Sequence, residues 1–395
     1  MTHPSTLIKH YSQSKRRGKI IGFGAFAMAS ILTTLLTLIE KKLQQLTSPP
    51  REEIINSPED FGLNYENLET QTPNQKLVSG WLIRPENNGG QKTTKVVILS
   101  HGYGKNRSAH PAVLQMAKHL VQNGVACILY DFENHGLIKG KKTSDDGRTT
   151  IGAKTEKNDL HTVIDHAKEL GYTDIGLVGV SMGAATSLQV AAERDDIQMV
   201  VADSAFTSLK SYLFEQISVW DKRIKPWMIK TLLKYVKVFK GIDVNQIQPI
   251  EAIKDLGKRG VEVRLIHTIG DQVTPEKNSI ELAQAYLAAY NQSHTTPKKL
   301  DDVRMLTKSY SEKFQREDTT QRDHCRSIDV DPDGYRSFVV DSMIEKLGKV
   351  KPELRPTNQP EQVKFFSALK RASKKINPIT VIRSRRHQRH MEPLH

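Results

Sequence analysis

A serine lies between two glycines in the segment Gly179-Val180-Ser181-Met182-Gly183. The apolar run Ile175–Val180 before it predicts a buried strand, and the alanine-rich stretch Met182–Arg194 after it predicts a helix. A serine on a sharp turn from strand to helix exposes its hydroxyl, and side chains two positions to either side would collide, so both must be glycine. The spacing predicts Ser181 as a nucleophile and places the Met182 amide at a helix N-terminus, where it can stabilise an oxyanion. A structural Gly-Ser-Gly turn without chemistry is the alternative.

Short apolar runs alternate with helical stretches from about residue 61 onward. Predicted strands are Asn64–Glu69, Lys76–Ile83, Lys95–Ser100, Val125–Tyr130, Ile175–Val180, Met199–Ala202, Glu262–His267 and Val303–Thr307, and predicted helices are Ala109–Asn123, Glu156–Leu170, Met182–Arg194 and Pro275–Tyr290. This alternation is typical of βαβ units, so the predicted fold class is α/β, with a mostly parallel sheet and helices on both faces. In such sheets the site lies at the carboxyl ends of the strands, which is where the serine stands.

Around this serine the chain resembles the α/β-hydrolase superfamily, in particular its single-domain esterases and prolyl-oligopeptidase-like members. Ser100–Arg107 resembles the family's oxyanion loop, and Asp131–Gly136 resembles its D-x-R-x-H-G loop. Leu265–Pro275 is similar to the stretch that carries the catalytic acid, and His324–Tyr335 to the stretch that carries the base. Further matching segments are Thr150–Leu160, Asp203–Phe206 and Pro249–Ile253. The resemblance covers residues 61–347 and has the family's order of serine, acid and histidine.

The resemblance implies a catalytic triad of Ser181, Asp271 and His324. A serine hydroxyl is a weak nucleophile until a base accepts its proton, and the His324 imidazole can take that proton and return it to the leaving group. Asp271 would orient the imidazole and stabilise its charged form. The backbone amides of Tyr103 and Met182 would form the oxyanion hole. No cofactor is implied, and no spacing of histidines or cysteines is typical of a metal site.

Some residues depart from the family pattern. Glu133 stands where the D-x-R-x-H-G loop usually has arginine, and the interval from Asp271 to His324 is longer than usual. Residues 308–323 in that interval predict a long polar loop, which is often a lid or a segment ordered by a partner. His294 is the alternative base, although it lacks the D-P-x-x-Y sequence that follows His324.

The other noteworthy histidines and cysteines have simpler predicted roles. Cys325, beside the predicted base, is an incidental neighbour, with a reactive thiol as the alternative. The histidines next to predicted strand ends should hold loops rather than catalyse: His101, His135 and His267. Two cysteines in the chain exclude a disulfide framework and a cysteine-based zinc site.

The positive charge of the chain is concentrated at its two ends. The chain has 395 residues, 37% of them hydrophobic, and a formal net charge of +14. Residues 1–19 contribute +5 and residues 364–395 contribute +8, which leaves +1 for residues 20–363. The central part is therefore nearly neutral, and nucleic acid is not an expected partner.

Residues 20–39 form an uncharged run between basic flanks. As a helix this run would be about 30 Å long, the thickness of the hydrocarbon core of a bilayer. It predicts an uncleaved transmembrane helix, and a cleaved signal peptide or a buried helix is the alternative. The excess of basic residues before the run predicts a cytoplasmic N-terminus and an extracytoplasmic catalytic domain. Residues 40–60 contain Pro49 and Pro50 and predict a linker.

The predicted catalytic domain spans residues 61–350, with a helical cap at about 205–245. In this cap Pro226–Gly241 is amphipathic, with apolar residues on one face and lysines on the other: Ile229, Leu232, Leu233, Val236 and Phe239 against Lys230, Lys234 and Lys237. Such a helix is either an ordinary cap helix with a solvated basic face, or one that lies on an anionic bilayer with Trp220 and Trp227 at headgroup level. Residues 351–395 predict a basic, disordered tail, with binding to anionic lipid or nucleic acid as alternatives.

These patterns together predict a membrane-anchored serine hydrolase that cleaves carboxylic esters or thioesters through an acyl-enzyme. Lipid or acylated substrates are preferred because of the anchor and the basic cap. A serine peptidase with the same triad is the competing enzyme. A non-catalytic binding protein on a hydrolase fold is the competing class, since a fold does not dictate its chemistry.

Overall fold

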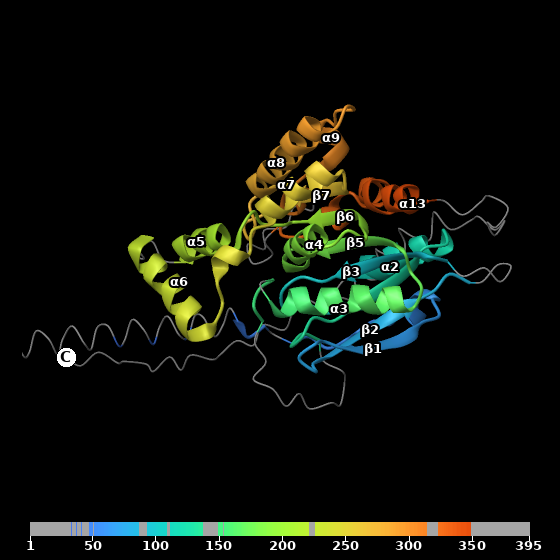
Figure 1. Ribbon diagram of the computed structural model, residues 1–395, viewed down its shortest axis with the longest axis horizontal. Helices are drawn as coiled ribbons and strands as arrows, with labels where there is room; N and C mark the ends of the chain where they lie inside the picture. Colours follow the sequence, from blue (N-terminus) through green and yellow to red (C-terminus); the bar gives the residue numbers. More distant parts are fainter. Residues whose placement is uncertain are drawn as a thin grey trace, which may run out of the picture.

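The computed structural model describes residues 47–49, 51–86, 93–108, 111–136, 149–152, 154–220, 226–313 and 323–348, together with positions 33, 37 and 41. Their central feature is an eight-stranded sheet in the order β1-β2-β4-β3-β5-β6-β7-β8 (Figure 1). The strands are β1 (Glu66–Gln71), β2 (Leu77–Ile83), β3 (Lys95–Ser100), β4 (Ala126–Tyr130), β5 (Asp174–Val180), β6 (Ile197–Asp203), β7 (Glu262–Thr268) and β8 (Arg304–Thr307).

The sheet is mostly parallel, as predicted. β1 pairs antiparallel with β2, and β2 pairs antiparallel with β4. All pairs from β4 to β8 are parallel. The carboxyl ends of six strands therefore meet at one edge, where the loops that carry chemistry can converge.

Helices cover both faces of this sheet, so the predicted α/β class is confirmed (Figure 1). Successive residues of a strand point to opposite faces, and Val96 and Val97 of β3 accordingly belong to two different core clusters. One cluster includes α3 (Thr155–Glu169), α4 (Met182–Ala192), α7 (Pro249–Arg259) and α8 (Lys277–Ser293). The other includes α2 (Pro111–Gln122), a π-helical turn (Arg336–Asp341) and α13 (Ser342–Leu347).

Two helices extend from the edge of the sheet at the predicted cap (Figure 1). They are α5 (Leu209–Trp220) and α6 (Pro226–Lys240), inserted between β6 and β7. Ile229 and Val236 of α6 are buried, whereas Lys230 and Lys234 are exposed. The amphipathic pattern of this helix thus agrees with its burial. The short helices are Pro58–Phe61, Val244–Gln246, α9 (Leu300–Val303), α10 (Tyr310–Lys313), α11 (Ser327–Val330) and α12 (Pro332–Tyr335).

Some of the structure differs from the sequence-based expectation. The helix α7 and the helical region from α11 to α13 were not predicted. Residues 51–60, predicted as part of a linker, lie against the domain instead. The Asn106 side-chain amide donates hydrogen bonds to the carbonyl oxygens of Glu52 and Glu53, at 3.0 and 3.2 Å. These contacts extend the folded domain towards the N-terminus by about ten residues beyond the predicted boundary at residue 61.

In the part of the chain that the structure describes, no helix has the length and apolar composition needed to cross a membrane. The predicted span, residues 20–39, lies outside that part except for Thr33 and Thr37. The basic segment 1–19 and the tail 351–395 also lie outside it. The predictions for these segments therefore stay predictions.

The C-terminal helix α13 should be an integral part of the hydrophobic core. Met343 is fully buried and lies against Gly176 of β5. We expect Met343→Ala to lower the free energy of unfolding by about 2–5 kcal/mol, because it leaves a cavity in the core. The exposed neighbour Lys346 provides the control, and Lys346→Ala should change this free energy by less than about 0.5 kcal/mol. Equal effects of the two substitutions in urea unfolding would contradict the packing of α13.

Candidate active site

The turn between β5 and α4 holds Ser181 in an unusual backbone conformation. Its φ is 53° and its ψ is −115°, a region that non-glycine residues rarely adopt. The Ser181 amide donates to the carbonyl oxygen of Asp203, at 2.7 Å. A Cβ at position 179 would overlap the backbone of Gly183, and a Cβ at position 183 would overlap the carbonyl oxygens that end β3. Glycine is therefore required on both sides of the serine, as the sequence pattern predicts.

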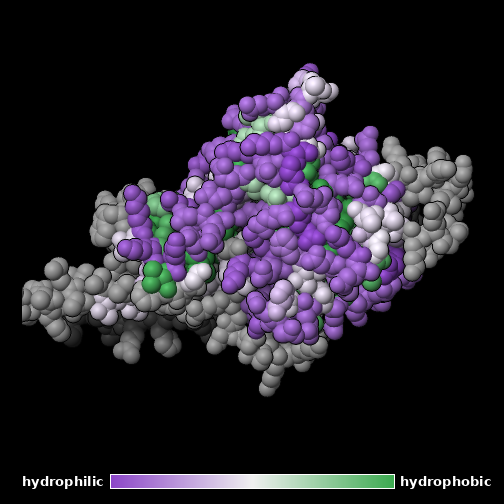
Figure 2. Space-filling view, viewed as in Figure 1, coloured by the Kyte–Doolittle hydropathy of each residue, from purple (hydrophilic) through white to green (hydrophobic). Residues whose placement is uncertain are grey.

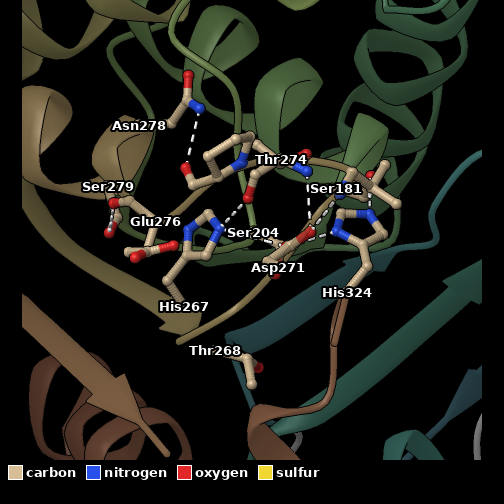
Figure 3. Close-up of polar contacts among 12 residues, drawn as sticks. Ser181, Ser204, His267, Thr268, Asp271, Thr274, Glu276, Asn278, Ser279 and His324 are labelled. Carbon is tan, nitrogen blue, oxygen red and sulfur yellow. Dashed lines mark hydrogen bonds and ion pairs between the residues drawn. The ribbon is translucent and has the colours of Figure 1, made fainter. Parts of the chain in front are cut away.

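Ser181, His324 and Asp271 are joined by two hydrogen bonds (Figure 3). Nε2 of His324 lies 2.8 Å from Oγ of Ser181, and Nδ1 lies 2.7 Å from Oδ2 of Asp271. Because a carboxylate only accepts, Nδ1 carries the proton, and Nε2 of the neutral ring accepts from the serine hydroxyl. The structure thus brings together the three residues predicted as a triad.

Asp271 is held as a carboxylate by four donors. The amides of Val273 and Thr274 both donate to Oδ1 at 2.8 Å. His324 donates to Oδ2, and Nε2 of His267 lies 3.3 Å from the same oxygen. Burial raises the pKa of the Asp271 carboxyl, but the hydrogen bonds from His267 and His324 outweigh it and hold the pKa well below its ordinary value. This carboxylate can therefore stabilise a positive charge on His324.

His267 ties the loop that carries Asp271 to the end of β7. Its side chain is fully buried, and Nε2 lies 2.5 Å from the carbonyl oxygen of Thr274 (Figure 3). Because a carbonyl only accepts, Nε2 of His267 must carry a proton. The Asp271 carboxylate lies near the same nitrogen. This contact agrees with the loop-holding role predicted for His267.

The loops after β3 and β4 meet beside the nucleophile. A Cβ added at Gly102 would lie 3.5 Å from Cβ of Ser181, so the loop containing Tyr103 borders the serine. Nδ1 of His101 donates to the Gly102 carbonyl oxygen at 2.8 Å, and Nε2 accepts from the Phe132 amide at 3.0 Å. Burial, followed by the nearby His135, lowers the pKa of His101 to about 3, so this ring is a neutral link between the two loops.

Met182 is the first residue of α4, and its amide has no acceptor within the helix because the first four amides of any helix lack one. It therefore points its partial positive charge towards the site, next to the Ser181 hydroxyl. Gly102, the neighbour of Tyr103, borders Ser181, and Met182 follows the serine in the chain. The oxyanion hole formed by their backbone amides stays a prediction.

The chain is similar to known hydrolases in sequence and in fold. Residues 91–259 match the family model described as serine aminopeptidase, S33. The structure is similar to that of an esterase from Pyrococcus furiosus, with a TM-score of 0.52 and 21% identity, covering 76% of this chain and 98% of the esterase. The chain has the α/β-hydrolase fold. The match to the family described as serine aminopeptidase, together with this fold, supports a serine hydrolase of the esterase or peptidase type.

Two curated relatives match this α/β-hydrolase over a shorter region. An acyl transferase from Photobacterium leiognathi is 32% identical over 139 residues, which are 35% of this chain and 41% of the transferase. The uncharacterized protein YfhR of Escherichia coli is 23% identical over 145 residues, 36% of this chain and 48% of that protein. The matched regions thus span less than half of the length of either relative.

Asp203, at the end of β6, is a functional-site residue whose role the sequence did not reveal. Its carboxylate accepts from the Ser204 hydroxyl at 3.0 Å and from the Tyr335 hydroxyl of α12. Burial raises the pKa of Asp203 to about 6, while Ser204 and the nearby His267 oppose the rise. Since the Asp203 carbonyl also holds the Ser181 amide, this residue connects the nucleophile turn to the segment that follows His324. We infer that it is a positioning residue.

Two further contacts hold the His324 segment. The Ser309 hydroxyl donates to Asp323 at 2.8 Å. The Ser327 hydroxyl lies 3.0 Å from the Thr268 hydroxyl and accepts from Thr307 at 3.2 Å. The predicted loop 308–323 thus has both of its ends fixed to the domain, and residues 314–322 within it lie outside the described residues.

His294, the alternative base, is not at the site. It ends α8, its Nδ1 lies 3.0 Å from the Tyr290 carbonyl oxygen, and its ring stacks on Tyr290 with centroids 4.2 Å apart.

Burial raises the pKa of the Cys325 thiol well above its ordinary value, which disfavours the thiolate that a reactive cysteine needs. Among the described residues, no three side chains of the metal-binding types are grouped as ligands.

Gly183→Ala should damage the fold at the nucleophile turn. The added Cβ would overlap the carbonyl oxygens of Ser100 and His101, which are backbone atoms that cannot rotate away. We expect the free energy of unfolding to fall by about 1–3 kcal/mol, as in overpacked cores. Gly102→Ala is the matched control, since its Cβ would make only ordinary contacts at 3.5 Å. Urea unfolding of both variants measures the difference, and equal stabilities would refute the close approach.

Asp203→Asn should change the pH dependence of stability. The folded pKa of Asp203 is raised from 3.8 to about 6, so its contribution is fully present below 3.8 and is lost as pH rises through 6. Asparagine does not ionise, so the Asp203→Asn variant does not lose stability in this way as pH rises. Its free energy of unfolding, relative to the unsubstituted chain, should therefore rise by up to about 3 kcal/mol between pH 4 and pH 7.

The exposed Asp195 provides the control for this pH series. Urea unfolding of Asp195→Asn across the same pH range should parallel the unsubstituted chain. A difference between Asp203→Asn and the unsubstituted chain that does not vary with pH would contradict the raised pKa of Asp203.

Proposed function

We propose that the protein is a serine hydrolase that cleaves carboxylic esters or thioesters through an acyl-enzyme. The observation that carries the proposal is the unbroken hydrogen-bonded path from Ser181 through His324 to Asp271, with separations of 2.8 and 2.7 Å. The serine hydroxyl, the base and the orienting acid are already at reacting distances, as nucleophilic catalysis requires. A non-catalytic binding protein would have no need of this alignment.

In the proposed reaction Oγ of Ser181 attacks the carbonyl carbon of the substrate while Nε2 of His324 takes the hydroxyl proton. The negative charge on the carbonyl oxygen is stabilised by the backbone amides of Met182 and Tyr103. As the tetrahedral intermediate collapses, His324 gives its proton to the departing alcohol or thiol, and an acyl group stays on Ser181. Water, deprotonated by His324, then attacks the acyl group, and the acid leaves as Oγ regains its proton. Asp271 remains a carboxylate throughout and stabilises the imidazolium.

An apolar acyl group is the substrate feature that the surroundings of the triad favour. Phe206 stacks on Tyr212 of α5, with ring centroids 5.4 Å apart. Tyr103, Tyr212 and Phe214 are only partly buried, although they pack against the core. Burial, and then the nearby Tyr212, raises the pKa of Tyr103 to about 12, so this side chain is uncharged at neutral pH. The similarity to an acyl transferase supports the same choice, because acyl transfer and ester hydrolysis share an acyl-serine step.

The proposal includes attachment to a membrane through residues 20–39, with the catalytic domain on the extracytoplasmic side. It rests on the uncharged run and on the excess of basic residues before it. Resistance of the full chain to extraction by alkaline carbonate tests the attachment, and release into the supernatant would refute it.

A fluorophosphonate probe tests the activated serine directly. We expect the full chain to be labelled, Ser181→Ala to be unlabelled, and His324→Ala to react at least about a hundredfold more slowly, because the general base is lost. His294→Ala is the matched control and should react like the unsubstituted chain. A folded chain that is not labelled, or equal losses in the two histidine variants, would overturn the assignment.

Cleavage of peptides is the second candidate, because the matched family is described as serine aminopeptidase. Hydrolysis rates on acyl thioesters of increasing chain length, compared with those on aminoacyl anilides, separate the two activities. Our proposal expects rates that depend on acyl length and little turnover of the anilides.

A further inference from the structure

The segment 222–240, which includes helix α6, is strongly basic. Residues 222–240 contain seven lysines and arginines and no acid. Since residues 20–363 have a net charge of only +1, the remainder of that region has a net charge of −6. Helix α6 lies in this basic segment, whereas the rest of residues 20–363 is acidic by sequence.

The basic side of α6 faces away from the domain. Lys230, Lys234 and Lys237 are exposed, and Lys237 pairs with Asp243 at 2.6 Å. Val238 stands among these lysines with 64% of its surface exposed, whereas Ile229 is buried on the other side. Hydrophobic and hydrophilic patches alternate on the surface over α5 and α6 (Figure 2), which extend away from the sheet (Figure 1).

The N-terminal segment crosses the edge of the sheet that carries the active site. The carbonyl of Thr47 accepts from the Thr149 amide at 2.8 Å, and Arg51 donates to Asn134 at 3.1 Å. Glu52 pairs with Lys105 at 2.6 Å. These three partners lie in loops after β3 and β4, at the carboxyl ends of the strands, beside the loop that borders Ser181.

This path limits where the predicted membrane segment can be. The chain can span at most about 28 Å between residue 39 and Thr47, which is fixed to the site edge. A membrane span that ends at residue 39, as proposed, would therefore lie near the active-site edge. The basic cap, which is inserted after β6, leaves the sheet at the same edge.

We propose that the lysine face of α6, formed by Lys230, Lys234 and Lys237 with Val238, docks on an anionic phospholipid bilayer and holds the active-site edge towards it. The charge of the face and its single exposed valine fit a negatively charged, partly apolar surface. The N-terminal path brings the same edge to the membrane independently. The inference deepens the proposed function, since it names the bilayer as the source of acylated substrate.

A lysine footprint of the full chain tests this surface. The chain is assembled with nanodiscs of phosphatidylcholine alone, or of phosphatidylcholine with phosphatidylserine, and acetylated with a water-soluble N-hydroxysuccinimide ester. Mass spectrometry then gives the rate at each lysine. We expect Lys230, Lys234 and Lys237 to react at least about fivefold more slowly on the anionic discs, the fold-change that corresponds to the binding free energy of one lysine at an anionic surface. The exposed Lys258 of α7 and Lys346 of α13 should react equally on both.

Charge reversal provides a matched pair of variants. In Lys230→Glu/Lys234→Glu the protection of Lys237 on anionic discs should disappear, whereas Lys258→Glu/Lys346→Glu should retain it. All four lysines are exposed, so both variants should fold.

Three results would overturn the proposal. They are equal acetylation rates on the two kinds of disc, equal protection of Lys258 and the α6 lysines, or protection of the α6 lysines only when a single-stranded RNA replaces the discs. The footprint is independent of catalysis. Ser181→Ala should give the same pattern, so a failure of the proposed reaction can be told apart from a failure of this surface.

Discussion

The close approach of the first turn of α4 to the end of β3 is the constraint on which the site depends. Neither Gly179 nor Gly183 has room for a Cβ, so backbone packs directly on backbone there. This contact accompanies the unusual conformation of Ser181, and Met182 begins α4 directly after it. One packing contact thus positions both the serine and the residue proposed as an oxyanion donor. His324 and Asp271 then extend from this serine through two hydrogen bonds.

Three histidines near the strand ends show how burial and partners give the same side chain different properties. His101 is buried with one donor and one acceptor as partners, so it is neutral and joins two loops. His267 is buried against Thr274 and the Asp271 carboxylate. His324 retains 18% exposure of its side chain, and it alone contacts the serine. Such partial exposure is what the proposed reaction requires, because the His324 proton must reach a leaving group and water must reach the acyl-serine.

Features formed by residues that are consecutive in the chain were predicted best. The turn at Ser181 is defined by five consecutive residues, and the strands β3 to β7 are short apolar runs, so both were predicted. His324 and Asp271 were found only through their resemblance to a family, because the distance between them along the chain hides their contact. Asp203 and Tyr335 show the same difficulty, since neither residue is unusual until β6 and α12 are packed together. The π-helical turn Arg336–Asp341 adds a residue to one helical turn, which shifts the hydrophobic period and obscured the C-terminal helices.

The hydrogen bond between Ser309 and Asp323 has a consequence for how this protein can vary. It closes the chain just before His324, so contacts at the base of the loop and at Ser327 fix the chain on both sides of the histidine. The entropy of closing a loop grows only with the logarithm of its length, by about 0.6 kcal/mol for each doubling. The intervening segment can therefore gain or lose residues at little thermodynamic cost. A change in its length would leave the hydrogen bonds of Ser309 and Ser327 on either side of His324 in place.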